Sequence, residues 1–196
     1  AALLRAALPA DPTAARLYAE GLERTRAGDL LGARERLEEA ARIEPAFPLV
    51  HAALAEAWAG LGYDQRARDE AARAVPLAGH LPREGRLLVE ARQAEASRDW
   101  PRAIEAYGAL FGFFPDNLEY GLRLARVQAN NGRAPDALGT VDTLRALPPP
   151  AGNDPRIDVL EAVAAGSVGD YRRGRSAAER GAELISELLD FGRNEQ

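Results

Sequence analysis

The sequence predicts an all-α fold made of five helix-turn-helix units, and three observations predict it. Ala and Leu dominate an apolar fraction of 46%, whereas aromatic residues make up only 6% of the 196 residues. This balance favours helix over sheet. Small residues recur at a nearly constant interval along the chain, each preceded by a turn signal. Between these turns the apolar residues follow a helical spacing.

The recurring small residues set the register of the predicted units. They open the second helix of each unit at intervals of 34, 36, 34 and 37 residues, and they are Ala33, Ala67, Ala103, Ala137 and Gly174. The turn signals four or five positions earlier are Gly28-Asp29, Gly62-Tyr63, Arg98-Asp99, Gly132-Arg133 and Gly169-Asp170. Small residues on facing helices let two backbones approach at the close end of the ~8 to 10 Å range. The pattern therefore predicts closely packed helical hairpins.

Helix boundaries are marked most clearly in the third unit. Asp99 can accept hydrogen bonds from the free amides of a first helical turn, and Pro101 stands where no intrahelical donor is lost. Pro115 cannot continue a helix, so we expect this helix to end just before it. The proline-rich stretch at 146–156 predicts a stiff, extended connector.

The residues at these positions resemble the tetratricopeptide repeat (TPR) family, whose period is about 34 residues. The third unit carries the family pattern as Leu87, Ala91, Ala94, Ala103, Tyr107, Leu110 and Pro115. The stretches ARLYAEGLERTRAGDLLGAR and FFPDNLEYGLRLA are similar to the repeat regions of bacterial eukaryotic-like serine/threonine kinases and winged-helix regulators. The resemblance implies five units stacked as a right-handed superhelical solenoid.

The domain organisation that follows is a single TPR array over 14–190. Its units are expected at about 14–47, 48–83, 84–117, 118–154 and 155–190. Residues 1–13 are expected to form a lead-in helix or tail, and 191–196 a short tail. The chain begins at Ala1 and contains no methionine, so we interpret it as a fragment of a longer protein.

Charge and composition exclude several classes of function. A net charge of −5 and a pI near 5.2 argue against a nucleic-acid partner, because phosphate contacts need a basic face. We expect no membrane segment in this fragment, because no apolar run approaches the roughly 20 residues that a spanning helix needs. The absence of cysteine leaves the compartment open. We expect a cytoplasmic location, with the periplasm as the alternative.

No catalytic constellation emerges from the sequence, so we expect a protein that is not an enzyme and needs no cofactor or metal. Glu20, Glu90 and Glu161 recur at one repeat position. Two units apart, they should lie about 20 Å from one another, which is beyond the roughly 5 to 9.5 Å over which paired carboxylates act together. We expect them to bond backbone or a neighbouring arginine. His51 and His80 have no partner at ligand spacing, which favours ordinary packing or solvent exposure.

The resemblance implies that the first helix of each hairpin lines a concave groove. The candidate groove residues are Tyr18, Leu22, Arg26, Glu56, Arg92, Arg123, Arg126 and Asn130. Arg92 and Arg126 are one repeat apart, so they should stack, face solvent and hold carboxylates by bidentate pairing. The alternative is a solvated face with intrahelical pairs, such as Arg92 with Glu95 or Glu119 with Arg123. Arg145 and Arg180 are expected outside the groove.

We therefore expect a scaffold that binds a protein or peptide partner, acidic in character, as the accessory module of a bacterial signalling protein. The alternative is a sensory or dimerisation domain that binds a small ligand and regulates an attached kinase or DNA-binding domain. The tail AELISELLDF carries Leu184, Ile185, Leu188 and Leu189 on one side, so it either caps the array or mediates self-association.

Overall fold

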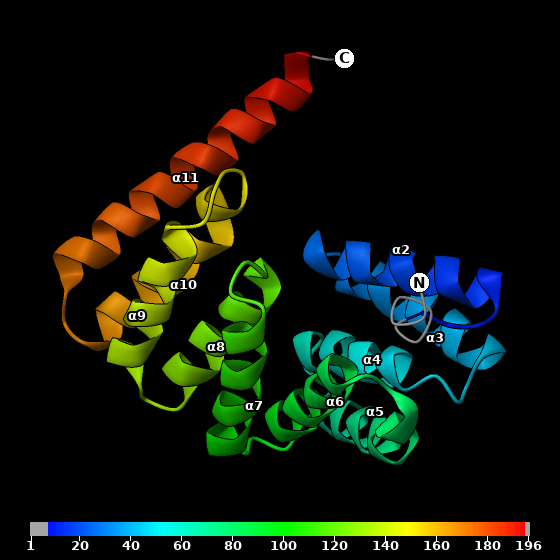
Figure 1. The fold of residues 1–196 in the computed structure, drawn as a ribbon. Helices are drawn as coiled ribbons and strands as arrows, with labels where there is room; N and C mark the ends of the chain where they lie inside the picture. Colours follow the sequence, from blue (N-terminus) through cyan, green and yellow to red (C-terminus); the bar gives the residue numbers. More distant parts are fainter. Residues whose placement is uncertain (1–7, 195–196) are drawn as a thin grey trace. The chain divides into compact units, whose positions relative to one another are not determined.

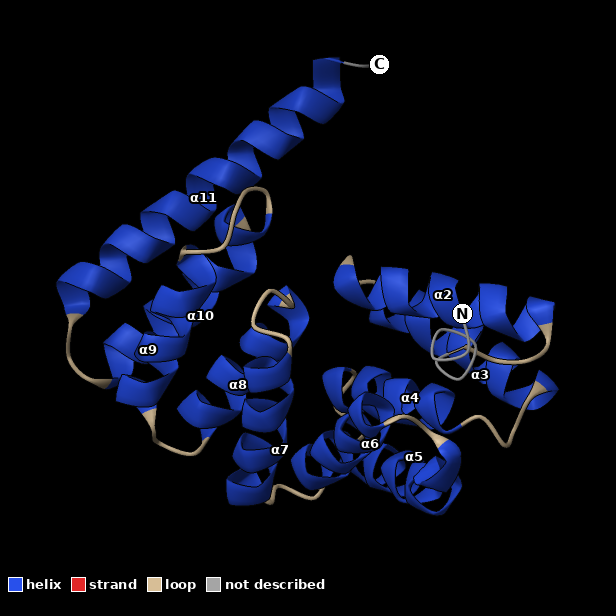
Figure 2. Cartoon of the chain, in the orientation of Figure 1, coloured by secondary structure: helices blue, strands red, loops and turns tan. Residues whose placement is uncertain are grey.

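The computed structural model describes residues 8–194, and side chains as far as residue 183. Ten α-helices and two short 3₁₀-helices lie in this part of the chain, and no strand occurs in it (Figures 1 and 2). The predicted all-α class is therefore confirmed. The chain divides into two compact units, Ala1–Ala106 and Tyr107–Gln196, and each is described by itself.

The first unit is built from consecutive helices that pack against their neighbours in the chain. Its elements are α2 (Pro12–Arg26), α3 (Leu30–Ile43), α4 (Pro48–Gly60), α5 (Asp64–Leu77), the 3₁₀-helix η1 (Ala78–His80), α6 (Arg83–Ala96) and the start of α7 (Trp100–Phe113). Helix α2 packs on α3, and α4 packs on α5. Helix α4 also contacts α6, so first helices of successive hairpins lie side by side.

The second unit repeats this arrangement. It contains the end of α7, then α8 (Leu118–Asn130), α9 (Ala134–Arg145), the 3₁₀-helix η2 (Ala151–Asn153), α10 (Pro155–Ser167) and α11 (Tyr171–Asn194). Helix α8 packs on α9 and α10 packs on α11, while α10 also contacts both α8 and α9. A single superhelical array over both units, with its five unit boundaries, stays a prediction.

The connector between α9 and α10 differs from the expectation of an extended segment. Residues 151–153 form the 3₁₀-helix η2, which folds the proline-rich stretch into a turn. Gly152 is buried there, and a Cβ at this position would meet the backbone of Leu147 at 3.2 Å or less. The close backbone approach favours a compact turn over an extended chain.

All five turns that join the helices of a hairpin use the left-handed backbone conformation at one residue. The φ angles are +79°, +83°, +58°, +72° and +77°, at Gly28, Gly62, Arg98, Gly132 and Gly169. Glycine adopts this conformation without steric penalty, which explains four of the five residues. The turn positions predicted from the sequence are thus confirmed.

The small residues that follow these turns are buried as expected. Ala33, Ala67, Ala103 and Ala137 are at most 1% exposed, and Gly174 is half-buried. Asp99 caps the second helix of the third hairpin by accepting a hydrogen bond from the Arg102 amide at 3.3 Å. These contacts confirm the register of the repeat.

The helix boundaries expected for the third hairpin are confirmed too. Helix α7 begins at Trp100, directly after the capping Asp99 and directly before Pro101. It ends at Phe113, before Pro115. The proline therefore marks the end of the helix, as its missing amide requires.

Arg98 is the one residue of the five that has a side chain and a left-handed backbone conformation. Replacing it tests how much this conformation costs in folding free energy. A non-glycine residue there loses about 1 to 2 kcal/mol, whereas glycine makes the unfolded chain more flexible by about 0.4 to 1 kcal/mol. The Arg98–Asp64 pair, 2.6 Å apart, is exposed, so its loss matters little. We expect Arg98→Gly to be more stable than Arg98→Ala by about 1 kcal/mol in urea denaturation. Equal stability of the two variants would contradict this account.

Candidate functional site

Two of the predicted groove residues belong to the core of the first unit. Tyr18 on α2 is 6% exposed, and its ring meets that of Phe47 edge to face with 5.4 Å between centroids. Leu22, one turn later, is half-buried and packs on the same hydrophobic cluster, which also contains Ala52 of α4. Leu88 of α6 packs on this cluster too. Aliphatic and aromatic side chains therefore fill the first-helix face of this unit.

Arg92 is paired within the first unit, which corrects the expectation that it faces solvent. Its side chain is 14% exposed and forms an ion pair with Glu56, whose side chain is 11% exposed. Arg92 Nη1 also lies 3.6 Å from Glu95 Oε2, so the expected pair with Glu95 is present. Glu56 stands on α4 and Arg92 on α6, the neighbouring first helix. A guanidinium that leaves water needs such a partner, because desolvating an unpaired charge is costly.

The same arginine acts on the hydroxyl of Tyr18. Burial raises the pKa of Tyr18 to about 12, and the charges of Arg92 and Arg26 oppose that rise. The structure thus brings Tyr18, Arg26, Glu56 and Arg92 into one neighbourhood. Of these four, only Arg26 is exposed. Within this set, Glu56 offsets the charge of Arg92.

The first-helix face of the second unit is open by comparison. Helix α8 exposes Arg126 and Asn130, and Arg123 is half-exposed. The adjoining helix α10 exposes Val159 and Val163, whose exposed fractions are 59% and 56%. Four residues apart, the two valines lie on one side of α10.

An ion pair between α8 and α10 shows how these two faces meet. Glu119 accepts hydrogen bonds from Arg156 Nη2 at 2.8 Å and from Nη1 at 3.2 Å, across to the neighbouring helix. The two residues are 37 positions apart, as are Arg126 and Val163. Arg126 and Val163 therefore occupy matching positions about two turns further along the two helices. The predicted stacking of Arg126 on Arg92 stays a prediction, because the two arginines belong to different units.

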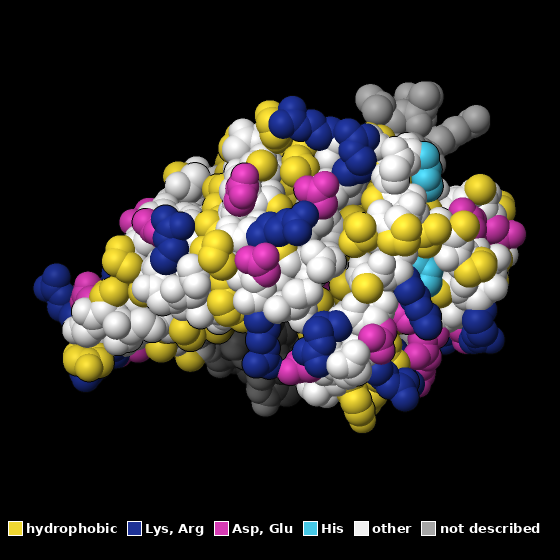
Figure 3. Space-filling view, turned by 90° about the horizontal axis from the view of Figure 1, so that it is seen from below, with side chains coloured by type: hydrophobic (Ala, Val, Ile, Leu, Met, Phe, Trp, Pro, Cys, Tyr) yellow, Lys and Arg dark blue, Asp and Glu magenta, His cyan; other side chains and the backbone are white. Residues whose placement is uncertain are grey.

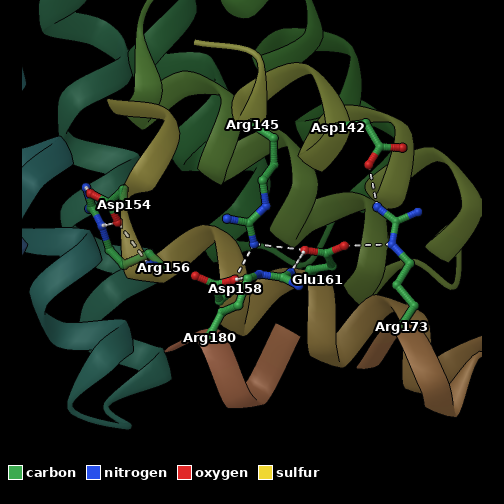
Figure 4. Close-up of polar contacts among 8 residues, drawn as sticks. All are labelled: Asp142, Arg145, Asp154, Arg156, Asp158, Glu161, Arg173 and Arg180. Atoms are coloured by element: carbon green, nitrogen blue, oxygen red, sulfur yellow. Dashed lines mark hydrogen bonds and ion pairs between the residues drawn. The ribbon is translucent and has the colours of Figure 1, made fainter. Parts of the chain in front are cut away.

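A buried charged cluster joins α9, α10 and α11 (Figure 4). Asp158 and Glu161 of α10 are 1% and 7% exposed. Glu161 accepts hydrogen bonds from Arg145 at 2.9 Å, from Arg173 at 2.7 Å and from Arg180 at 2.7 Å. The expectation that Glu161 bonds a neighbouring arginine is confirmed.

The remaining bonds of the cluster involve two more carboxylates. Asp158 accepts a hydrogen bond from Arg180 Nε at 3.1 Å and also pairs with Arg145. Arg173 pairs in addition with Asp142 of α9. We name Asp142, Arg145, Asp158, Glu161, Arg173 and Arg180 the arginine cluster. It ties three helices together.

Electrostatics in the arginine cluster favour the charged form of Glu161. Burial on its own would raise the pKa of this carboxyl, but hydrogen bonds and charge from Arg145 and Arg173 outweigh burial and lower the pKa below its usual value. Arg145 and Arg180, which were expected outside the groove, both pair with Asp158 and Glu161 in this cluster. Two spacings in the sequence could have indicated this cluster. Asp158 and Glu161 stand three residues apart on α10, and Arg173 and Arg180 stand seven residues apart on α11.

Three further expectations concern other parts of the chain. Within the described residues, no group of three acidic, histidine or cysteine side chains is placed to hold a metal ion. None of the described helices combines the length and the apolar character needed to cross a bilayer. The apolar tail with Leu184, Ile185, Leu188 and Leu189 lies outside the residues whose side chains are described.

Consecutive helical hairpins with left-handed turns define an α-helical repeat protein, and comparison with solved structures specifies the class. A kinesin light chain-like protein of Podosopora anserina with nearly identical TPR-like repeats matches at a TM-score of 0.56 and 18% identity, over 92% of this chain and 99% of that one. MamA matches at a TM-score of 0.51 and 14% sequence identity, over 87% of this chain and 96% of that one. A tetratricopeptide repeat protein of Parabacteroides merdae matches at a TM-score of 0.50 and 20% sequence identity, over 91% of this chain and 68% of that one.

The fold is therefore that of tetratricopeptide repeat proteins. At these identities the likeness describes the backbone and not the ligand. No protein-family model matches the sequence, and a search of curated proteins finds no significant match.

Proposed function

We propose that the chain is a non-enzymatic scaffold that binds a peptide segment of a partner protein on the first-helix face of its second unit. The observation that carries the proposal is the exposure of Val159 and Val163, both above half, on α10, which packs beside α8. Aliphatic side chains that stay in water next to polar neighbours are typical of the centre of an interface. We name Arg123, Arg126, Asn130, Val159 and Val163 the valine face.

On the first-helix face of the first unit, most of the side chains described above are packed or paired. Tyr18 and Leu22 pack into its core, and Arg92 pairs with Glu56. A ligand would have to displace these contacts before it could bind there, which would cost buried area and an ion pair. This comparison supports the second unit as the place of recognition.

The charges around the valine face indicate the chemistry of the peptide. Arg123 and Arg126 lie on α8, the helix that packs beside the α10 helix of the valines. An arginine binds a carboxylate through two parallel hydrogen bonds. A peptide with aliphatic side chains and a nearby carboxylate fits this surface. On the face seen in Figure 3, basic, acidic and apolar side chains are interspersed.

The biological setting forms part of the same proposal. The resemblance to repeat regions of bacterial kinases and regulators supports an accessory module of a signalling protein, acting in the cytoplasm. Such a module needs no catalytic group of its own. Its role would be to hold a partner close to an attached output domain, which raises the effective concentration of that partner.

A peptide-display experiment tests the valine face directly. Peptides are selected against the whole chain, and their affinity is then measured for the double variant Val159→Ser/Val163→Ser. Because both side chains would become buried on binding, we expect an affinity loss of about tenfold or more. The matched control is Leu31→Ser/Val75→Ser, which removes two exposed aliphatic side chains from α3 and α5. Selected peptides that bind both variants equally well would place recognition elsewhere.

A further inference from the structure

His51 makes a pair of contacts that limits its protonation state. Its ring, on α4, is 6% exposed. Nδ1 lies 2.7 Å from Glu70 Oε2 on α5, and Nε2 lies 2.8 Å from the carbonyl oxygen of Pro45. The ring thus has a close partner on each side, and its burial agrees with the expectation that His51 is a packing residue.

Both partners are acceptors, so both ring nitrogens must donate. A carbonyl oxygen carries no proton, and an ionised carboxylate carries none either. A neutral imidazole donates from one nitrogen only, and it could satisfy both contacts only if Glu70 were protonated. Arg73 argues against that form, because its Nη1 lies 2.9 Å from the other oxygen of Glu70 and favours the carboxylate.

We propose that His51 is a doubly protonated, pH-sensitive latch that ties α4 to α5 and to the turn after α3. Pro45 belongs to the turn that closes the first hairpin, whereas His51 and Glu70 belong to the second hairpin. One imidazolium therefore joins two successive hairpins of the first unit. When the imidazolium of His51 loses a proton, the ring keeps only one of its two hydrogen bonds. Arg73 then remains as the cationic partner of Glu70.

The charges around the ring favour the protonated form. The hydrogen bond to Glu70 is the largest cause and raises the pKa of His51. The hydrogen bond to the Pro45 carbonyl and the negative charge of Glu70 raise this pKa further, whereas burial and the positive charge of Arg73 lower it. The pKa in the folded state lies above the ordinary value of His. A raised folded-state pKa adds stability that is fully present below the unfolded-state pKa and disappears as the pH rises through the folded-state pKa. The latch therefore loosens as the pH rises through a folded-state pKa that lies above the ordinary value of His.

The chain provides its own reference for a test, because His80 is the only other histidine and it is exposed. The ring nitrogens of both residues are followed by nitrogen-15 NMR of the full chain from pH 5 to 9. We expect His51 to keep both nitrogens protonated at a pH where His80 is already neutral. Coincident titration of the two rings, or a titration of His51 below that of His80, would overturn the proposal.

Two variants link the titration to the latch. Glu70→Gln keeps an acceptor for Nδ1 but removes the negative charge, so the His51 titration should shift to lower pH, towards that of His80. His51→Gln, measured by thermal denaturation, should remove most of the loss of melting temperature that the parent chain shows between pH 6 and pH 9. An unchanged His51 titration in Glu70→Gln, or an unchanged pH dependence in His51→Gln, would overturn the latch. If His51→Gln does not fold, the titration in Glu70→Gln decides alone.

Discussion

Replacing Glu161 by alanine should lower the free energy of unfolding of the second unit by about 3 to 5 kcal/mol, the usual cost of removing one partner from a buried ionic network. Glu161 is 7% exposed and accepts hydrogen bonds from Arg145, Arg173 and Arg180. Without it, Arg145 and Arg180 would share the one carboxylate of Asp158, and Arg173 would keep only Asp142. Urea denaturation followed by circular dichroism measures the loss.

A matched control separates burial from charge. Asp136 pairs with Arg133 at 2.5 Å, but both side chains are about half exposed, at 45% and 52%. Asp136→Ala should therefore change stability by less than about 1 kcal/mol. If Glu161→Ala were as mild as this control, water would be solvating the arginines and the cluster would contribute little to stability. Hydrogen exchange should show the loss first in α10 and α11, which the cluster joins.

The contact between Gly121 and Leu144 should give the second large effect. Leu144 on α9 is fully buried, and Leu144→Ala should cost about 2 to 5 kcal/mol through lost packing and a cavity. Gly121→Ala should also destabilise, by about 1 to 3 kcal/mol, through overpacking. A Cβ at Gly121 would overlap Leu144 and stand 2.9 Å from Phe111 Cε2.

The double variant reveals whether the two residues share one space. In Gly121→Ala/Leu144→Ala the new methyl group enters the volume that leucine leaves, so the double variant should be more stable than the sum of the single costs implies. Gly139→Ala on α9 is the control. Nothing lies within 4 Å of a Cβ there, and the change should stabilise by about 0.5 to 1 kcal/mol through helix propensity. Strictly additive costs for Gly121 and Leu144 would contradict the shared contact.

The sequence predicted those features that depend on neighbouring residues. Asp99 and Pro101 mark the start of a helix through local hydrogen bonding and a local dihedral angle, and the structure confirms both. Ala103 was expected in a close helix contact and is fully buried. The repeat makes such local signals more reliable, because the same turn signal occurs at five positions in register.

Partners distant in the chain could not be predicted in the same way. Periodicity places Arg92 on the first-helix face, but it does not choose between Glu95 one turn away and Glu56 on another helix. The structure shows that Glu56 holds the guanidinium and that burial follows from the pair. His51 is a similar case, because Glu70 stands 19 residues later. Tertiary packing decides which acceptor a charged side chain reaches. The spacing of residues along one helix does not predict that acceptor.

The predicted groove is a further example of this limit. Repeat position alone assigns Tyr18 and Arg126 to the same kind of surface. Tyr18 is buried against Phe47, whereas Arg126 is exposed. Val159 and Val163 lie in the same first-helix row by repeat position, but the sequence does not show how exposed they are. Their exposure is visible only once α8 and α10 are placed.

Helix α7 has a consequence for anyone who wishes to divide the molecule. The boundary between the two units falls inside it, so Ala103 belongs to one unit and Tyr107 to the other. A cut at that boundary would leave a helical stub of two turns on one fragment, too short to be stable by itself. It would also strip the other fragment of the start of the helix that carries the fully buried Tyr107 and Leu110. Two overlapping fragments, each with the whole of α7, would avoid both losses.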